Sequence, residues 1–197
     1  NLGAPHIIEK VGPYRFTIKP DVFFQSNPLL IWKAYEDIKE WIYGRVLDLY
    51  CGIGTISIYI SDACDHVTGV EIADSSVQAA RENARLNGIE NVRFYASDVG
   101  EYLKRDVRFD VIVVDPPRPG LSRKIIKRIK RIGPDRIVYM SCNPVTQFED
   151  LKRLCDEYEL ERPIRAYDMF PQTYHVETLA ILKRRSRRKG RRRVRDG

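Results

Sequence analysis

From about residue 45 onward, short apolar runs alternate with amphipathic segments. In residues 121–132, for example, four isoleucines recur at helical spacing between Lys and Arg residues. Apolar runs that alternate with helices of this length are typical of a parallel, doubly wound sheet covered by helices on both faces. We therefore predict an α/β, Rossmann-like fold built on a mostly parallel, seven-stranded sheet.

The predicted elements divide the chain into three parts. Seven strands are predicted at 46–50, 67–71, 92–96, 109–114, 136–140, 166–169 and 178–182, and helices at 55–61, 75–87, 121–132 and 148–158. Residues 1–45 fit the alternation less well. They are expected to form a lead-in with a β segment at 14–19 and a helix at 28–41. The main domain is then 46–182, followed by a basic tail at 183–197.

Length, cysteine content and hydropathy narrow the class of protein. The chain has 197 residues, which is a usual size for one domain. No apolar run approaches the roughly 20 residues that span a bilayer. None of the four cysteines lies at C-x-x-C spacing, so neither a metal site nor an iron–sulfur site is expected. No signal peptide is visible and the chain opens with Asn1, so we expect a cytoplasmic protein that is a piece of a longer one.

The net charge of +7 is concentrated at one end of the chain. Residues 183–197 hold ten Lys and Arg and one Asp, a charge of +9, which leaves −2 for the preceding 182 residues. Blocks of this kind often bind polyanions, and each arginine can pair with a phosphate through two hydrogen bonds. The basic tail therefore favours a nucleic-acid partner over an unpartnered, solvated end.

Acidic residues and glycines gather where the predicted strands end. Ligands of an open α/β sheet bind beyond the carboxyl ends of its strands. That edge carries Gly52 and Gly54, then Glu71, Asp98 and Asp115. The glycine run is not G-x-G-x-x-G and no lysine follows it, so neither a dinucleotide fingerprint nor a P-loop is present. Carboxylates suit a cationic sulfonium with a ribose, and we predict an S-adenosylmethionine site rather than a tight turn beside ordinary surface acids.

A rigid loop follows the fourth predicted strand. Asp115 precedes two prolines, which stiffen the backbone, and Arg118 comes next. A fixed carboxylate at this place can read the imide N–H of uracil. The arginine replaces the aromatic residue of related loops that clamp adenine. Asp115 and Arg118 are therefore predicted to bind a substrate base other than adenine.

Two further residues supply a nucleophile and a base. Cys142 directly follows the fifth predicted strand in a polar turn, and Glu177 precedes the last. A thiolate that adds to C6 of uracil turns C5 into a nucleophile, and a base must then remove the C5 proton. Lone cysteines and glutamates are more often structural, and Cys51 competes as the thiol. Together with a methyl-donor site, this chemistry nevertheless favours Cys142 as the nucleophile and Glu177 as the base. Cys64 and Cys155 are expected to be structural.

Four motifs resemble the RNA 5-methyluridine methyltransferase family. They are Leu47–Gly54 (LDLYCGIG), Asp115–Gly120 (DPPRPG), Ser141–Thr146 (SCNPVT) and His175–Glu177 (HVE). The resemblance implies an S-adenosylmethionine-dependent methyltransferase fold, with 46–182 as the catalytic domain and a uridine in tRNA or rRNA as the substrate. It implies that Cys142 is the C6 nucleophile and that Glu177 abstracts the proton. It also implies donor contacts from these residues: Gln25, Tyr50, Thr55, Glu71 and Asp98.

Two alternatives stay open. RNA 5-methylcytidine methyltransferases use a second cysteine where this chain has Asp115–Pro117, and a non-catalytic RNA-binding module would share the fold. The resembling family also carries an N-terminal RNA-binding barrel, and in many members a cysteine-bound iron–sulfur cluster, which this sequence lacks. The expected partner is structured RNA, without a membrane, and the expected state is a monomer.

Overall fold

The computed structural model describes residues 6–20, 24, 27–169, 172–173 and 176–186. The strands are β1 (Ile7–Val11), β2 (Tyr14–Ile18), β3 (Arg45–Leu49), β4 (His66–Glu71), β5 (Val92–Ala96), β6 (Val111–Val114), β7 (Arg136–Ser141), β8 (Tyr158–Leu160), β9 (Arg165–Tyr167) and β10 (Glu177–Arg184). The helices are α1 (Pro28–Lys39), α2 (Thr55–Tyr59), α3 (Asp74–Leu86), α4 (Val99–Tyr102), α5 (Arg123–Ile132) and α6 (Pro144–Leu154), with a 3₁₀ turn η1 (Ser61–Ala63).

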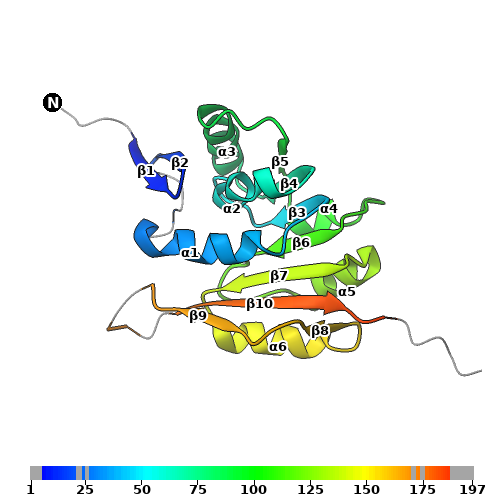
Figure 1. Cartoon of the computed structure of the whole chain (residues 1–197). Helices are drawn as coiled ribbons and strands as arrows, with labels where there is room; N and C mark the ends of the chain where they lie inside the picture. Colours follow the sequence, from blue (N-terminus) through cyan, green and yellow to red (C-terminus); the bar gives the residue numbers. More distant parts are fainter. Residues whose placement is uncertain (1–5, 21–23, 25–26, 170–171, 174–175, 187–197) are drawn as a thin grey trace, which may run out of the picture.

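One sheet dominates the fold (Figure 1). Its order is β5-β4-β3-β6-β7-β10-β8, and β9 also pairs with β10. The pairs among β3, β4, β5, β6 and β7 are parallel, whereas β10 runs antiparallel to β7. Strands β8 and β9 pair with opposite ends of β10, so eight strands occupy seven positions. The predicted mostly parallel α/β fold is confirmed, with the outer position divided between two short strands.

Helices bury both faces of the sheet, so its central strands are apolar throughout. All four residues of β6 are buried and alternate between two clusters. Val111 and Val113 join the cluster that includes residues of α1, α2 and α3, while Ile112 and Val114 join the cluster with α4, α5 and α6. Continuous apolar strands of this kind are expected when a parallel sheet is covered on both sides.

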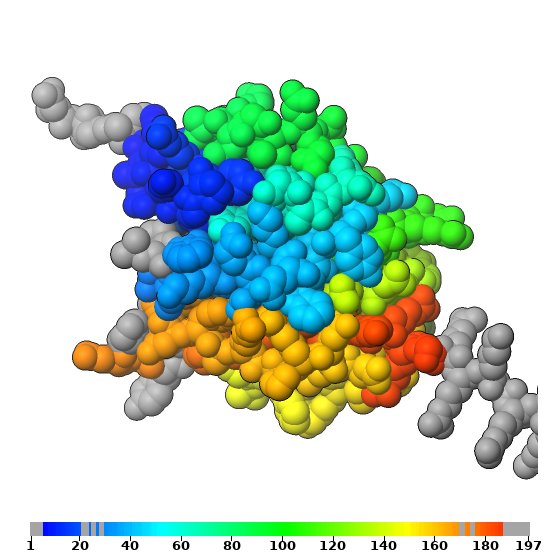
Figure 2. All heavy atoms as spheres, viewed as in Figure 1, coloured from blue at the N-terminus to red at the C-terminus, as the bar shows by residue number. Residues whose placement is uncertain are grey.

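The lead-in shares its core with the sheet. Val11, Phe16, Ile31 and Tyr35 are all nearly fully buried in the same cluster as sheet residues such as Val113. Figure 2 shows the blue atoms of the hairpin and the light-blue atoms of α1 lying directly against the cyan and orange parts of the chain. The first strand, β1, has no counterpart among the predicted elements.

The main error in the predicted elements concerns α6. This helix was predicted at 148–158 but runs from Pro144 to Leu154. Asn143 caps it by accepting a hydrogen bond from Val145 N at 3.2 Å, and proline at the first helical position already has the required φ. Residues 155–157 form a turn, and strand β8 begins at Tyr158, the last residue of the predicted helix. Helix α4 was also not predicted, and β10 continues to Arg184, within the expected basic tail.

Asn83 of α3 and Asn87, which caps the end of that helix, hold the exposed edge of β2. Asn83 accepts a hydrogen bond from Thr17 N at 2.8 Å, and one helical turn later Asn87 accepts from Arg15 N at 2.9 Å. Asn83 also donates to Ile53 O at 3.4 Å, in the turn that follows β3. Side-chain amides thus take the place of a neighbouring strand and satisfy backbone groups at a sheet edge.

Replacing Asn83 with alanine should cost about 1–3 kcal/mol of unfolding free energy, because it leaves buried backbone groups without partners. The Asn87→Ala variant should cost less than about 1 kcal/mol, since water can reach the groups it leaves near Arg15. Urea denaturation of both variants measures the difference. Equal losses would show that Asn83 is not the main connection between α3 and the hairpin.

Candidate active site

The carboxyl ends of the parallel strands gather most of the predicted site residues at one edge of the sheet. The glycine turn 50–54 follows β3, Glu71 ends β4, Asp98 follows β5 and Asp115 follows β6. Cys142 follows β7, and the reversed β10 begins at the same edge with Glu177 (Figure 1). Gln25 and His175 lie outside the described residues.

The glycine turn and Glu71 form one hydrogen-bonded unit. Oε2 of Glu71 accepts from Gly52 N at 3.2 Å, and Oε1 accepts from Ile72 N at 2.8 Å and Ala73 N at 3.0 Å. A carboxylate offers about four acceptor sites. After these three backbone bonds, Glu71 therefore keeps acceptor capacity for a hydroxyl, while its position is fixed.

Several residues of this turn have positive φ, and at Gly54 both the backbone conformation and the space require glycine. Gly54 has φ +81°, and a Cβ at this position would lie 2.7 Å from the Phe94 ring. Tyr50 also has positive φ, at 66°, although it carries a side chain. Such backbone strain persists where the surroundings impose it, which is common at functional sites.

A cavity opens beside this turn. It is lined by Phe24, Tyr35, Tyr50, Cys51, Gly52, Ile53, Thr55, Ile56 and Asp115. The Tyr35 hydroxyl donates to Thr55 Oγ1 at 3.3 Å. Burial raises the pKa of Tyr50 to about 12, and the charges of Asp98, Asp150 and Glu71 act in the same direction. Tyr50 and Thr55 thus both line this cavity. Glu71 and Asp98 do not line it, but Glu71 accepts from Gly52 N beside it and the charge of Asp98 acts on Tyr50. Asp98 also caps α4 by accepting from Glu101 N at 2.9 Å.

Three acidic side chains have raised pKa values: Asp115, which lines this cavity, and the buried Asp48 and Glu177. Asp48 is fully buried and accepts from Ser57 Oγ at 2.5 Å, and burial raises its pKa to about 7. Burial, together with the charges of Glu177 and Asp48, raises the pKa of Asp115 well above its usual range. Glu177 is 3% exposed, and burial raises its pKa to about 7. Within the described part of the chain, Oε2 of Glu177 has no hydrogen-bond partner.

Cys142 faces both a carboxylate pair and a guanidinium. Its thiol is partly buried, which raises its pKa, and the charges of Glu177 and Asp115 raise it further. The Arg118 guanidinium opposes them, lowering the thiol pKa by its charge and by a hydrogen bond. The charges of Glu177, Asp115 and Arg118 therefore all act on the Cys142 thiol, and Arg118 also forms a hydrogen bond with it. Cys51 is buried with a pKa raised well above its usual range, and Cys155 is exposed, so neither thiol shares this setting.

The strand register explains why Cys142 and Glu177 meet. In the antiparallel pair, Thr178 lies opposite Ser141 and Leu179 opposite Met140. Continuing the register by one residue places Glu177 opposite Cys142. Opposed residues of an antiparallel pair have Cα atoms about 4.5–5.5 Å apart. The reversed direction of β10 therefore brings a carboxylate from the end of the chain to the thiol.

Asp150 of α6 holds the loop that carries Asp115 and Arg118. Its Oδ2 accepts from Leu121 N and from the Tyr139 hydroxyl, both at 2.7 Å. The backbone carbonyl of Arg118 accepts from Asn143 Nδ2 at 3.1 Å and Thr146 Oγ1 at 3.0 Å. These bonds fix the substrate loop against the Cys142 turn. Asp150 and Tyr35 were not among the predicted site residues, because each has the helical spacing of ordinary core or surface positions.

Among the residues the structure describes, no group of three or more His, Cys, Asp or Glu side chains could hold a metal ion. In the same residues, no helix is long and apolar enough to cross a membrane. What the site offers is a thiol, a guanidinium and carboxyls whose pKa values are raised, beside a cavity lined by acidic and aromatic groups.

Known proteins match this chain over most of its length. The family described as tRNA (Uracil-5-)-methyltransferase matches residues 8–185. An uncharacterised RNA methyltransferase of Halalkalibacterium halodurans is 40% identical over 188 residues, which are 91% of this chain and 41% of the relative. A similar protein of Thermosynechococcus vestitus is 41% identical over 187 residues, again 91% and 41% of the two chains. The chain therefore spans less than half the length of these relatives.

A solved structure agrees with these relatives. The tRNA (uracil-54, C5)-methyltransferase of Pyrococcus abyssi, crystallised with S-adenosyl-L-homocysteine, superposes with a TM-score of 0.83 at 36% sequence identity. The match covers 91% of this chain and 45% of that one. The tRNA m1G37 methyltransferase of Methanocaldococcus jannaschii has the same fold, with a TM-score of 0.74 at 18% identity over 93% of this chain and 58% of its own.

The buried Asp48 makes stability depend on pH. Its pKa in the folded protein, about 7, exceeds the ordinary value of 3.8, so folding favours the protonated form. The corresponding stability is fully present below about pH 4 and is lost as pH rises through about 7. The Asp48→Asn variant, which still offers Ser57 an acceptor, should gain stability relative to wild type as pH rises from 4 to 8. Urea titrations at several pH values measure this, and a constant difference between the proteins would contradict it.

Proposed function

Because this chain belongs to the tRNA (uracil-5-)-methyltransferase family, we propose that it transfers a methyl group from S-adenosylmethionine to C5 of a uridine in structured RNA, tRNA or rRNA. The observation that supports the proposal is that Thr178 pairs with Ser141, so Glu177 and Cys142 are the next residues at the junction of β10 and β7, and that the charge of Glu177 and a hydrogen bond from Arg118 act on the thiol. In this arrangement the thiol can add to C6 of uracil and the carboxylate can remove the C5 proton.

The donor side of the site fits S-adenosylmethionine. The carboxylate of Glu71 has acceptor capacity for a ribose hydroxyl beside the tight turn at Gly52. The cavity is lined by Tyr35, Tyr50 and Asp115, which suit an aromatic base and a positive charge. When bound, the donor supplies an electrophilic methyl group on a sulfonium. The family's solved member from Pyrococcus abyssi was crystallised with the demethylated product of this donor.

The protein's residues then divide the chemistry. Arg118 stabilises the thiolate of Cys142, which forms a bond to C6 of uracil and moves an electron pair toward C5 and O4. C5 takes the methyl group. Glu177 removes the remaining C5 proton, and the returning electron pair breaks the bond between sulfur and C6. Asp115, whose backbone is stiffened by the two prolines that follow it, forms a hydrogen bond with the uracil ring.

A carboxyl with a pKa near 7 suits the role of base. Glu177 must be ionised to accept a proton, and burial keeps it a stronger base than an exposed glutamate. The like charge of Asp115 nearby also disfavours ionising both groups at once. A 5-methylcytidine methyltransferase would present a second cysteine at 115–117, where this chain has Asp-Pro-Pro.

Replacing Cys142 with alanine should lower the methylation rate by more than about 10³-fold, because no other route activates C5. It should leave RNA and donor binding close to wild type. With 5-fluorouridine-substituted tRNA and rRNA transcripts, wild type should form a denaturation-resistant adduct, since fluorine cannot be removed from C5 as a proton. The Cys155→Ala variant is the matched control and should form the adduct. Turnover by Cys142→Ala near the wild-type rate would exclude the mechanism.

Replacing Glu177 with glutamine should slow turnover by about 10²–10⁴-fold and should cause a covalent complex to accumulate on unsubstituted RNA. Wild-type kcat/KM should rise with pH through about 7, the pKa of Glu177, and should rise again at higher pH as the Cys142 thiol, whose pKa is raised, ionises. The glutamine variant should lack the first rise. Equal pH profiles in the two proteins would assign the base to another residue.

A further inference from the structure

Helix α5 is strongly basic on its solvent side. Over ten residues it holds six Lys and Arg and no Asp or Glu: Arg123, Lys124, Lys127, Arg128, Lys130 and Arg131. Its buried residues are Ile126 and Ile129, which pack on the sheet. Of the basic side chains, Arg123, Lys124, Lys127 and Arg131 are exposed. The exposed face of this helix is therefore almost purely cationic.

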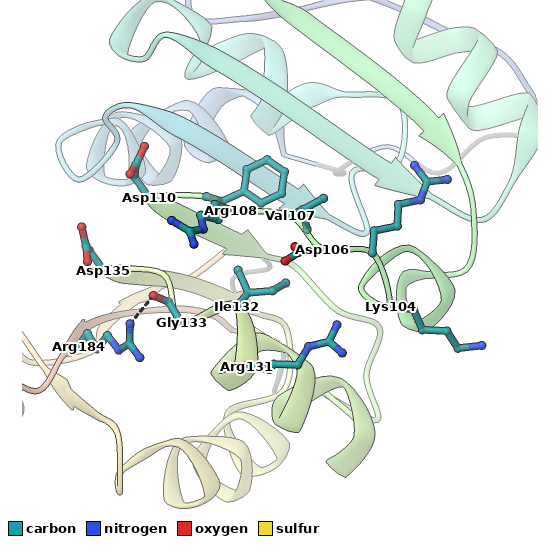
Figure 3. A pocket seen from close by; sticks show the side chains of 12 residues that line it. Lys104, Asp106, Val107, Arg108, Asp110, Arg131, Ile132, Gly133, Asp135 and Arg184 are labelled. Carbon is teal, nitrogen blue, oxygen red and sulfur yellow. Dashed lines mark hydrogen bonds between the residues drawn. The ribbon is translucent and has the colours of Figure 1, made fainter.

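The helix leads into a hollow of about 700 Å³ at the edge of the sheet opposite the candidate active site. The hollow is lined by residues 104–110, 131–133, 135 and 184 (Figure 3). Five of these residues are basic and three are acidic: Lys104, Arg105, Arg108, Arg131 and Arg184 against Asp106, Asp110 and Asp135. One of the three acidic side chains forms a hydrogen bond within the protein, because Asp110 accepts from Arg45 N at 2.7 Å.

Several cations of the hollow are held in place by the protein. Arg131 donates to Leu103 O at 2.6 Å, and Arg184 donates to Gly133 O at 2.8 Å, the bond drawn in Figure 3. The Arg105 guanidinium lies 4.6 Å from the centre of the Tyr102 ring. Side chains fixed in this way lose little conformational entropy when they bind an anion. Lys104 and Lys130 are paired with Glu101 and Asp156 at 2.5 Å, so they contribute less.

The helix and the hollow form one continuous strip. Helix α5 starts just after the loop of Arg118, whose end is fixed by the bond from Leu121 N to Asp150. Its ten residues span about 15 Å and end at Gly133 in the hollow. There β10 brings in Arg184, and the sequence that follows, 187–197, holds seven more Lys and Arg. We name the strip of Arg105, Arg108, Arg123, Lys124, Lys127, Arg131 and Arg184 the basic track.

We propose that the basic track binds the phosphate backbone of the RNA that flanks the target uridine, on the α5 side of the molecule. This inference rests on the proposed function for the identity of the RNA. Arginine-rich surfaces match phosphates in charge and in bidentate geometry. The contact carries no base specificity, so it anchors and orients RNA whose target base is read near Arg118 and Asp115.

Two triple variants with the same loss of charge test the proposal. The track variant is Arg108→Gln/Lys124→Gln/Lys127→Gln, and the control is Lys10→Gln/Lys33→Gln/Arg85→Gln, on β1, α1 and α3. All six side chains are exposed. Binding of a tRNA transcript is measured by fluorescence anisotropy between about 50 and 300 mM salt. The track variant should bind at least about 10-fold more weakly at low salt, and the slope of log affinity against log salt should flatten by about 2–3.

Further readouts separate this proposal from the proposed function. In the track variant, donor affinity and kcat at saturating RNA should stay at wild-type values, while KM for RNA rises. If both variants lose affinity equally, or if neither does, the track is not an RNA site. Loss of methylation chemistry in every protein, with a track-specific loss of RNA binding, would overturn the proposed function and leave the track standing. If methylation is normal and the track variant binds RNA as wild type does, the proposed function stands and the basic track is not an RNA site.

Discussion

The antiparallel pairing of β10 with β7 is the constraint on which the rest of the site depends. A parallel strand at this position would begin at the opposite edge of the sheet and carry Glu177 away from Cys142. A register shift of one residue would turn the Glu177 side chain to the other face. The register is fixed by Gln147, which donates to Tyr139 O at 3.0 Å and Thr178 O at 3.4 Å, and by Thr178 Oγ1, which donates to Ser141 O at 3.1 Å.

The same pairing concentrates acidic groups in a desolvated place. Asp115 and Glu177 raise the pKa of the Cys142 thiol, and Arg118 is the cation that counters them. Burial disfavours the charged form of each carboxyl, which raises its pKa. The raised pKa is useful in catalysis, but burying the group lowers the stability of the fold. The buried Asp150 differs, because its Oδ2 accepts hydrogen bonds from Leu121 N and from the Tyr139 hydroxyl.

Local patterns in the sequence predicted much of the fold. The strand ending at Leu49, the turn at Gly52 and the thiol after β7 could be predicted because apolar runs and glycines act over a few residues. The roles of Cys142 and Glu177 came from the resemblance to a family, and they remain proposals. The register that joins these two residues could not be predicted, because it depends on contacts between segments 35 residues apart in the sequence. Tyr35 was missed for a related reason: it lies among the buried Ile31, Ala34 and Ile38 of α1, and nothing local marks it as part of a site.

Asn83 joins two parts of the molecule that differ in role. Its amide accepts from Thr17 in the N-terminal hairpin and donates to Ile53 in the glycine turn. Local opening of either segment breaks bonds that the other also uses, so the two belong to one cooperative unit. A molecule that binds and orders the turn must then also slow hydrogen exchange in the hairpin, although it touches no residue there. Hydrogen exchange in the N-terminal hairpin therefore reports whether a molecule is bound at the glycine turn.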